Sequence, residues 1–286
     1  MFVSFRSVSV VGALLCGVAA HAQVSEKTFL EQFVKPDQVL SVKEAAGNLS
    51  GVVYNFDTQT YFVIQNNSYQ IVEYDKTFTK SLRTIKLVNL PDKDTEDIAY
   101  LGKDQFAINM ENNLILIFTL KAGQTSVDVS PKRDDVQALQ LPAPRKDNKG
   151  IEGLCFAPKV GANGTFYAVQ EDRPKRVFMI PRPADSKDVF SHRNLKYFEP
   201  FNVDKIFKHV MSDLAGCTFD EKTGHVIILS HESSRLMEVT QGGVVVKTLD
   251  LPTVVEQYEG VTVGPEGELV LVSEPDKVVI FKPKAR

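Results

Sequence analysis

The chain has few cysteines and, beyond its first residues, no long apolar run. Of its 286 residues three are cysteine, and Cys16 lies in the apolar run at the N-terminus. The other two, Cys155 and Cys217, are too few for the disulfide framework of a small secreted domain. No other stretch has the roughly 20 apolar residues that a membrane-spanning helix needs. We therefore expect no membrane insertion once the first segment is removed.

The chain also lacks the short motifs of several enzyme classes. It contains no G-x-S-x-G nucleophile elbow, and stretches such as AGQTSVDVS and GANGTF have no phosphate-loop pattern. Its formal net charge of −3 is mildly acidic, which gives no reason to expect nucleic acid or an anionic membrane as a partner. The classes left open are a binding protein, an envelope scaffold and a metal-dependent enzyme.

Residues 1–22 have the pattern of a cleaved signal peptide. Arg6 is the one basic residue, the run from Val8 to Ala20 is apolar, and small residues precede Gln23. This order of basic, apolar and small residues is typical of secretory signals. We therefore predict a periplasmic or secreted protein whose residues 23–36 form a linker or a short helix.

A short motif recurs five times along the rest of the chain. It consists of a small or acidic residue, usually a glycine, an aliphatic residue, any residue, and an aromatic or aliphatic one. The copies are SGVVY from Ser50, EDIAY from Glu96, EGLCF from Glu152, AGCTF from Ala215 and EGVTV from Glu259. Their second residues, at positions 51, 97, 153, 216 and 260, are 46, 56, 63 and 44 residues apart. Propeller blades repeat at about 40–50 residues.

Each motif opens a unit of short strands. After it come a turn and two more apolar segments, such as TFYAVQ and RVFMI, and in most units a more polar fourth segment such as VKTLDLP. Short strands at this spacing indicate an all-β fold, and four per unit indicate a propeller blade. The fifth unit ends after three segments, and DQVLSVKE at 37–44 has the character of the missing fourth.

We therefore predict one β-propeller domain over 37–286, with five four-stranded blades and the N-terminal strand completing the last blade. Six blades stay open, because the 63-residue interval is long. An inserted helix near Val203–Met211 is our preferred interpretation of that interval.

The repeated acids fall at two places in each unit. The first strand of a blade runs along the channel and the second returns antiparallel to it, so the start of one and the end of the other share a face. The starts hold Ser50, Glu96, Glu152, Ala215 and Glu259, with Asp213 two residues before Ala215. The ends hold Asn66 or Asn67, Glu111, Glu171, Glu232 and Glu274.

Carboxylates gathered in this way need a counter-charge. Two of them about 6 Å apart repel by roughly 3 kcal/mol at an effective dielectric constant of about 20. Oxygen ligands without a Cys or His cluster favour a hard cation, calcium before magnesium. We predict a calcium site among Glu96, Glu111, Glu152, Glu171, Asp213, Glu232, Glu259 and Glu274. The alternative for any single acid is a turn cap or a partner of Lys149, Arg173 or Lys175.

The sequence resembles the SdiA-regulated (YjiK-like) family of bacterial exported β-propellers. The stretches that carry the likeness are NKGIEGLCF, FYAVQEDRPKRVFMI, SDLAGCTFDEKTGHVIILSHESSRLMEV and YEGVTVGPEGELVLVSEP, with DTEDIAYLG in the first half. The resemblance implies a five-bladed propeller with a calcium site and a more distant kinship to NHL-repeat propellers. NKGIEGL is also similar to the opening motif of esterase-like phytases. Ser50 and Ala215 depart from the acid at the ring position, which leaves open which blades supply ligands.

Three functions compete on this basis. The first is a calcium-bearing propeller that binds a small molecule, glycan or protein at its acidic mouth, and the second is a non-catalytic envelope scaffold. The third is a calcium-dependent hydrolase of ester, lactone or phosphomonoester bonds, in which the cation polarises the substrate. His231 is the best general-base candidate, with Glu232 beside it. Part of a phosphate cradle is offered by Arg173, Lys175, Arg176 and Arg235. We expect a monomer.

The two remaining cysteines stand at different offsets in their repeats. Cys155 follows its glycine by two residues and Cys217 by one, so they project from opposite faces of their strands. Neighbouring blades pack opposite faces together, so contact is allowed, and an oxidising compartment would permit a bond. Because other blades have aliphatic residues or threonine at these places, we expect two buried free thiols.

Overall fold

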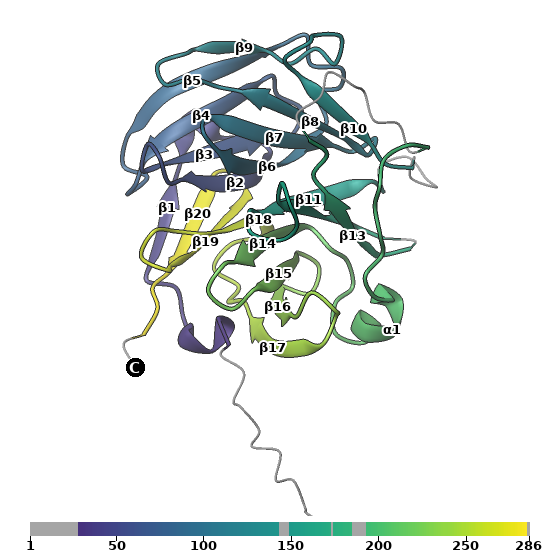
Figure 1. Ribbon diagram of the computed structural model, residues 1–286. Helices are drawn as coiled ribbons and strands as arrows, with labels where there is room; N and C mark the ends of the chain where they lie inside the picture. Colours follow the sequence, from purple (N-terminus) through teal and green to yellow (C-terminus); the bar gives the residue numbers. More distant parts are fainter. Residues whose placement is uncertain (1–27, 143–148, 173, 185–192, 285–286) are drawn as a thin grey trace, which may run out of the picture.

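Five β-sheets stand around a central channel, and in each sheet the strand that carries a copy of the motif is innermost (Figure 1). The computed structural model describes residues 28–142, 149–172, 174–184 and 193–284, so the predicted signal peptide lies outside the described residues. The predicted all-β propeller of five blades is confirmed, and the six-bladed alternative is wrong. No helix in the described ranges combines the length and apolarity that crossing a bilayer requires.

The first two blades follow the predicted order. The first comprises β2 (Leu49–Asn55), β3 (Thr60–Gln65), β4 (Gln70–Asp75) and β5 (Ser81–Val88). The second comprises β6 (Thr95–Gly102), β7 (Gln105–Met110), β8 (Leu114–Thr119) and β10 (Gln137–Gln140). A short strand, β9 (Ser126–Asp128), leaves the second blade to pair in parallel with β5. This excursion accounts for the longer interval before the third motif.

The next two blades flank the long interval. The third comprises β11 (Ile151–Ala157), β12 (Thr165–Gln170) and β13 (Arg176–Pro181), and an isolated bridge from Met179 to Phe198 stands where a fourth strand would lie. The fourth comprises β14 (Gly216–Asp220), β15 (His225–Ser230), β16 (Arg235–Val239) and β17 (Val245–Asp250). Between the two blades lies the helix α1 (Val203–Phe207), which is shorter than expected.

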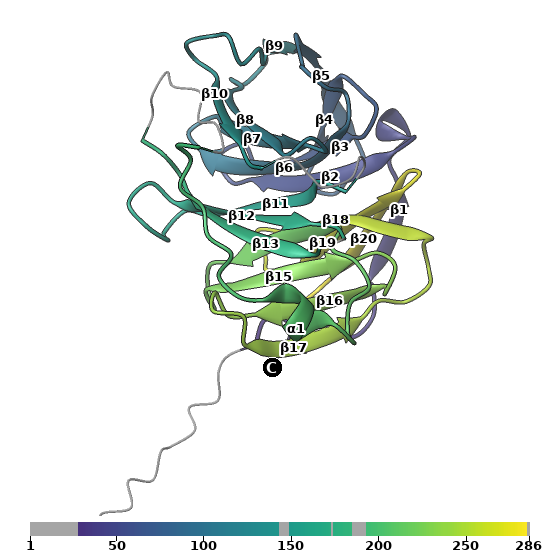
Figure 2. The ribbon, with the colours of Figure 1, turned by 90° about the vertical axis from the view of Figure 1, so that its right-hand side faces the viewer.

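The two ends of the chain close the ring. The fifth blade comprises β18 (Gln257–Val263), β19 (Leu269–Glu274), β20 (Lys277–Phe281) and β1 (Gln38–Ser41). β1 pairs antiparallel with β20, from Gln38 opposite Ile280 to Ser41 opposite Lys277, and the two lie side by side in both views (Figure 2). The predicted closure by the N-terminal strand is therefore confirmed, and it leaves β20 with no open edge.

Two short 3-10 helices precede the first blade, η1 (Leu30–Gln32) and η2 (Lys43–Ala45). The buried carboxylate of Glu238 on β16 fixes η1, because it accepts hydrogen bonds from the backbone N–H groups of Phe29, at 2.8 Å, and Leu30, at 2.9 Å. His225 Nδ1 lies 2.7 Å from the same carboxylate. The region predicted as a linker or short helix therefore contains a short helix held against the fourth blade.

The core of the protein lies between blades. Apolar side chains form five buried clusters, one between each pair of neighbouring blades. Middle strands such as TYFVIQ and TFYAVQ are buried along their whole length, because both of their faces meet a neighbouring sheet. This explains why the sequences of these strands are continuous apolar runs and do not alternate between apolar and polar residues.

The acid before each glycine is the extra residue of a β-bulge. In the pairing of β11 with β12, Ile151 and Gly153 face consecutive residues of β12, so Glu152 between them has no partner. The pairing of β18 with β19 leaves Glu259 unpaired in the same way. Ser50 occupies the same position in β2. A bulge re-aims the side chain of its unpaired residue, and here the re-aimed side chains line one mouth of the channel.

The glycine after each bulge is required by the close approach of the inner strands. A Cβ built on Gly153 would lie 2.6 Å from the Cα of Gly216, and one on Gly216 would lie 2.7 Å from the carbonyl oxygen of Glu259. A Cβ on Gly260 would lie 2.5 Å from the carbonyl oxygen of Ser50. These contacts are with backbone atoms, which cannot move aside without shifting a neighbouring blade.

The second blade replaces this glycine by Asp97, which is buried. Its Oδ2 accepts a hydrogen bond from the backbone N–H of Leu154 in the third blade, at 2.9 Å, and its Oδ1 accepts one from Ile98, at 2.8 Å. Burial raises the pKa of this carboxyl well above its usual value, against the effect of those two hydrogen bonds. Asp97 therefore connects neighbouring inner strands and does not belong to the acidic mouth.

The prediction of two free thiols is wrong. Cys155 of β11 and Cys217 of β14 form a disulfide whose Cα atoms are 5.6 Å apart. The two strands are neighbours in the ring, and their opposite offsets turn the two side chains toward each other across the gap between blades. Because 62 residues separate the two cysteines, the bond restricts a long loop in the unfolded chain and stabilises the fold by a few kcal/mol, roughly 4 in the chain-entropy account.

We predict that Gly153→Ala lowers the free energy of unfolding by about 1–3 kcal/mol, because its methyl group must displace the backbone of the fourth blade. The matched control is Gly242→Ala, since a Cβ at Gly242 would have no heavy atom nearer than 4.0 Å. The measurement is chemical denaturation of both variants and the parent protein. Equal stabilities of the two variants would show that the inner strands are not packed as described.

Candidate metal centre

A cavity of about 220 Å³ lies at the acidic mouth of the channel. Its lining is almost entirely polar: Ser50, Asn66, Asp94, Glu96, Glu111, Glu152, Glu171, Ala215, His231, Glu259 and Glu274. All five positions at the starts of the inner strands therefore line one cavity, together with four of the five positions at the ends of the second strands. The exception is Glu232, whose side chain is exposed and does not line it.

Three glutamates form the densest part of this lining. Glu96 on β6, Glu111 directly after β7 and Glu152 on β11 can each offer one carboxylate oxygen such that the three oxygens lie within 4.8 Å of one another. Glu96 and Glu111 are buried and Glu152 is half-buried. Oxygen atoms this close, from three separate carboxylates, make a site that one hard cation can bridge.

Proximity and burial oppose ionisation of these glutamates. Burial raises the pKa of Glu96 well above its usual value, and the charges of Glu111, Asp94 and Glu259 raise it further. Burial also raises the pKa of Glu152, followed by the charges of Glu96 and Glu111. Glu152 shares hydrogen bonds with both neighbours, and two carboxyl groups can do so only by sharing a proton. Without a cation, protons therefore provide the missing counter-charge.

Hydrogen bonds from neighbouring blades hold two of the three glutamates in position. Asn66 donates from Nδ2 to Glu96 Oε1 at 2.9 Å, and the backbone N–H of Gly150 donates to Glu111 Oε1 at 2.8 Å. Asn67, the alternative to Asn66, stands in the exposed turn and donates to Asn66 Oδ1 at 2.7 Å. The second blade thus supplies two acids, and its neighbours supply the groups that orient them.

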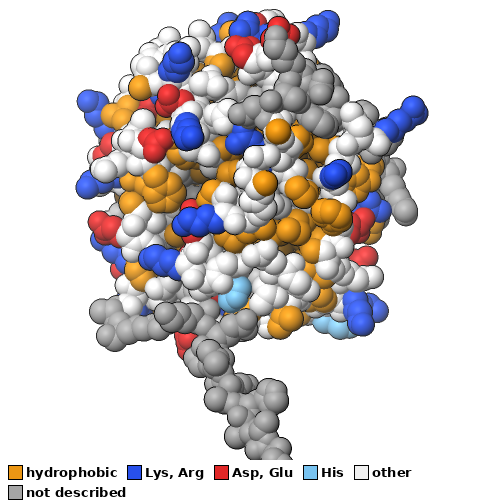
Figure 3. Space-filling model, in the orientation of Figure 1, with side chains coloured by type: hydrophobic (Ala, Val, Ile, Leu, Met, Phe, Trp, Pro, Cys, Tyr) orange, Lys and Arg blue, Asp and Glu red, His pale blue; other side chains and the backbone are white. Residues whose placement is uncertain are grey.

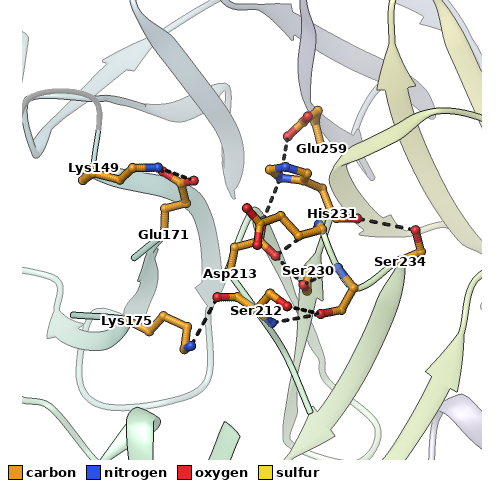
Figure 4. Close-up of polar contacts among 11 residues, drawn as sticks. Lys149, Glu171, Lys175, Ser212, Asp213, Ser230, His231, Ser234 and Glu259 are labelled. Carbon is orange, nitrogen blue, oxygen red and sulfur yellow. Dashed lines mark hydrogen bonds and ion pairs between the residues drawn. The ribbon is translucent and has the colours of Figure 1, made fainter. Parts of the chain in front are cut away.

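Glu171 already has a partner of its own. Lys149 Nζ lies 2.6 Å from both of its carboxylate oxygens (Figure 4). The ordinary alternative, a charge pair with Lys149, therefore holds for this acid, and both residues belong to the third blade. Arg173 lies outside the described residues, and Lys175 donates to the backbone carbonyl of Ser212 at 3.2 Å. Arg176 pairs with Glu199 and Arg235 pairs with Asp250, and none of the three described members of the expected phosphate cradle lines the acidic cavity.

His231 lies between two acids at the edge of the cavity (Figure 4). Its Nδ1 is 2.7 Å from Asp213 Oδ2 and 4.0 Å from Glu259 Oε2. The hydrogen bond to Asp213 raises the pKa of His231 to about 9, against the effect of burial. His231 is therefore a cation at neutral pH and supplies part of the counter-charge for Glu259.

Asp213 faces His231 and does not line the cavity. It is buried and also accepts hydrogen bonds from Ser230 Oγ and, at 3.2 Å, from the backbone N–H of Glu232. Burial disfavours its charge, but the hydrogen bonds from His231 and Ser230 lower its pKa below the usual value. Asp213 thus acts as the partner of His231, in place of the ligand role considered from the sequence.

Sequence reasoning missed Asp94, which lines the cavity two residues before Glu96. Asp213 likewise stands two residues before Ala215, the first residue of its motif copy. The rule that selected Asp213 from the sequence would therefore have selected Asp94 as well. Asp94 adds to the charge that raises the pKa of Glu96. Glu259 and Glu274 complete the fifth-blade side, where burial raises the pKa of Glu259 to about 7 although His231 acts in the opposite direction.

Comparison with known proteins agrees with this fold. The family described as SdiA-regulated matches residues 28–282. Among solved structures, the luciferin-regenerating enzyme has 15% sequence identity and a TM-score of 0.52, over 86% of this chain and 95% of that one. Regucalcin from Agrobacterium tumefaciens strain C58, a calcium-binding protein, has 10% identity and a TM-score of 0.51, over 88% and 96%. At these identities the two structures share the fold with this chain.

We predict that the metal-free protein loses stability as the pH rises from about 5 to 9. A group whose pKa is raised by folding stabilises the folded state fully at a pH below its pKa in the unfolded chain. This stabilisation is lost as the pH rises through the pKa of the group in the folded state. Glu259 therefore loses its contribution as the pH rises from its ordinary value of 4.5 through about 7, and His231 from 6.5 through about 9. Each contribution is at most about 3.5 kcal/mol, at about 1.4 kcal/mol per pKa unit.

The measurement is the melting temperature across this pH range in excess chelator. Glu259→Gln should flatten the lower half of the curve and His231→Gln the upper half. A melting temperature that stays level or rises from pH 5 to 9 would contradict the account.

Proposed function

This chain belongs to the SdiA-regulated family, and from that premise we propose that it is an exported calcium-binding propeller that presents the cation to a ligand at its acidic mouth. One observation carries the proposal: oxygens of Glu96, Glu111 and Glu152 lie within 4.8 Å of one another in a cavity lined by four further carboxylates. Seven carboxylates around about 220 Å³ exceed what His231 and Lys149 can balance.

The donor set fits calcium better than a transition metal. Every candidate ligand around the three glutamates is an oxygen, and no cysteine lines the cavity. Calcium accepts six to eight oxygen ligands in loose geometry, whereas magnesium demands a tight octahedron. When bound, calcium would be held by Glu96, Glu111 and Glu152, and its charge would remove the need for shared protons. The likeness to regucalcin is one of fold, so the carboxylates carry this proposal.

Two observations support export. Residues 1–22 have the order of a signal peptide, and Cys155 and Cys217 form a disulfide, a bond that persists in oxidising compartments. The ligand at the mouth is a small molecule, glycan or protein whose oxygen atoms complete the coordination of the cation.

The test is a calcium titration of the chelator-treated mature protein, followed by thermal unfolding and calorimetry, with magnesium as the competing ion. At a hundred times its dissociation constant, calcium should stabilise the fold by about 2.7 kcal/mol, which corresponds to roughly 5–10 °C in a protein of this size. Glu152→Gln should weaken calcium binding at least tenfold, or about 1.4 kcal/mol. Glu232→Gln is the matched control and should bind as the parent does. Equal calcium affinity of both variants would exclude the proposed site.

A second candidate, a calcium-dependent hydrolase, rests on the pair of His231 and Asp213. The imidazole lines the same cavity as the three glutamates, and the buried carboxylate fixes its orientation at 2.7 Å. Because His231 is protonated at neutral pH, it can donate a proton to a leaving group as a general acid rather than serve as the expected general base, while the calcium ion would polarise a carbonyl or phosphoryl oxygen.

Screening esters, lactones and phosphomonoesters with and without calcium tests this candidate. His231→Gln should abolish a calcium-dependent activity, by about 10²–10⁴-fold, and retain calcium affinity. Turnover that survives in His231→Gln would rule out this role. The absence of turnover on the whole panel would leave the binding protein as the function.

A further inference from the structure

The channel holds a second cavity at its other end. This cavity has a volume of about 430 Å³ and shares no lining residue with the acidic one. Along the inner strands, the lining of this cavity begins at the residue after each motif glycine, at Val52, Leu154 and Val261. The lining of the acidic cavity ends at the residue before the same glycine. The closely packed glycines therefore stand between two separate sites, and the calcium proposal makes no use of the second one.

The same repeat that builds the acidic mouth builds this cavity. Each copy of the motif begins with the residue that lines the acidic cavity and ends with one that lines the other: Tyr54, Tyr100, Phe156, Phe219 and Val263. Four of these five are aromatic. Figure 3 shows hydrophobic side chains gathered over the middle of one face of the ring, where the inner strands of Figure 1 meet.

Two polar groups stand inside this apolar wall. Thr218 and Thr262 occupy the same offset after their glycines in neighbouring inner strands, and they are 7% and 6% exposed. Within the described residues, neither hydroxyl has a hydrogen-bond partner. Neither hydroxyl oxygen is completely buried, so both are open to the cavity, and a ligand that displaces water from them must supply a hydrogen-bond acceptor in its place.

The charges at the rim offer no site for an ion. Asp57 accepts hydrogen bonds from the Tyr100 hydroxyl and the backbone N–H of Lys103. Glu221 pairs with Lys159 at 2.7 Å. Asp220 accepts from the backbone N–H of Thr223 at 3.0 Å and from its hydroxyl at 2.7 Å, and Lys222 is exposed. The acids are already satisfied within the protein, so apart from the exposed Lys222 at the rim the recognition groups that remain are apolar surface and the two hydroxyls.

We propose that this cavity binds a neutral small molecule with an apolar body of one or two rings and one hydrogen-bond acceptor. The aromatic rim encloses the rings, and Thr218 and Thr262 donate to the acceptor. A volume of about 430 Å³ lies within the range of roughly 300–1,000 Å³ of small-molecule sites, which are mostly apolar with a few placed polar groups. The site is independent of the cation at the opposite mouth.

The test uses the neutral naphthalene ketone 6-propionyl-2-dimethylaminonaphthalene, whose fluorescence shifts to the blue in apolar surroundings and whose carbonyl is the acceptor. We expect saturable binding of one probe per chain. Thr262→Val should weaken binding by about fivefold, the effect of one lost hydrogen bond of about 1 kcal/mol. Val263→Phe, which gives the fifth blade an aromatic residue like the other four, narrows the cavity and should weaken binding at least tenfold.

Two controls separate this site from other surfaces and from the metal centre. Val244→Ala changes an apolar residue that is 62% exposed and does not line the cavity, so it should bind the probe unchanged. Glu152→Gln should also bind it unchanged, with or without calcium. Absence of saturable binding, or binding that Thr262→Val and Val263→Phe both leave unaltered, would overturn the proposal. If Val263→Phe does not fold, the result with Thr262→Val decides.

Discussion

The close approach of the inner strands at their glycines is the constraint on which the rest of this structure depends. Where Gly153 meets Gly216, and Gly260 meets Ser50, backbone lies against backbone with no room for a Cβ. The glycine contacts join neighbouring blades directly, so they fix how the first strands surround the channel. The bulges before Gly51, Gly153 and Gly260 each turn one side chain toward the acidic mouth, and the residues after these glycines line the opposite cavity.

The acidic mouth carries a cost that the rest of the fold must offset. Burial and mutual repulsion raise the pKa values of Glu96, Glu152 and Glu259, so ionising them at neutral pH disfavours the folded state. His231 and Lys149 offset part of this cost through Asp213, Glu259 and Glu171. Under the proposed function, a divalent cation held by these carboxylates would offset the remainder.

Much of the fold could be predicted from the sequence because each copy of the short motif marks the inner strand of one blade, so a local pattern gives the arrangement of the whole ring. Five copies of one motif gave the number of blades, and a polar segment at 37–44 anticipated the pairing of β1 with β20. The outward path of β9 and the short α1 could not be placed, because they depend on contacts between blades that no repeat encodes.

In the candidate site, too, the residues that belong to the repeat could be predicted and their partners outside the repeat could not. Glu96, Glu111 and Glu152 follow from their position in the repeat, and they line one cavity. Which acids have other partners does not follow, because the repeat places the acids but not the basic side chains that meet them: Lys149 meets Glu171 between two loops of the third blade, and His231 meets Asp213 between two loops of the fourth. The disulfide of Cys155 and Cys217 was missed for a related reason: offsets within a strand give its faces, but the distance between two blades is set by packing.

A crystal structure of the mature protein grown with calcium, with anomalous diffraction recorded from the cation, tests the central claim most directly. The account predicts one anomalous peak at the acidic mouth, about 2.3–2.6 Å from an oxygen of each of Glu96, Glu111 and Glu152. A mouth without a peak, in which these carboxyl groups contact only one another and water, would contradict it.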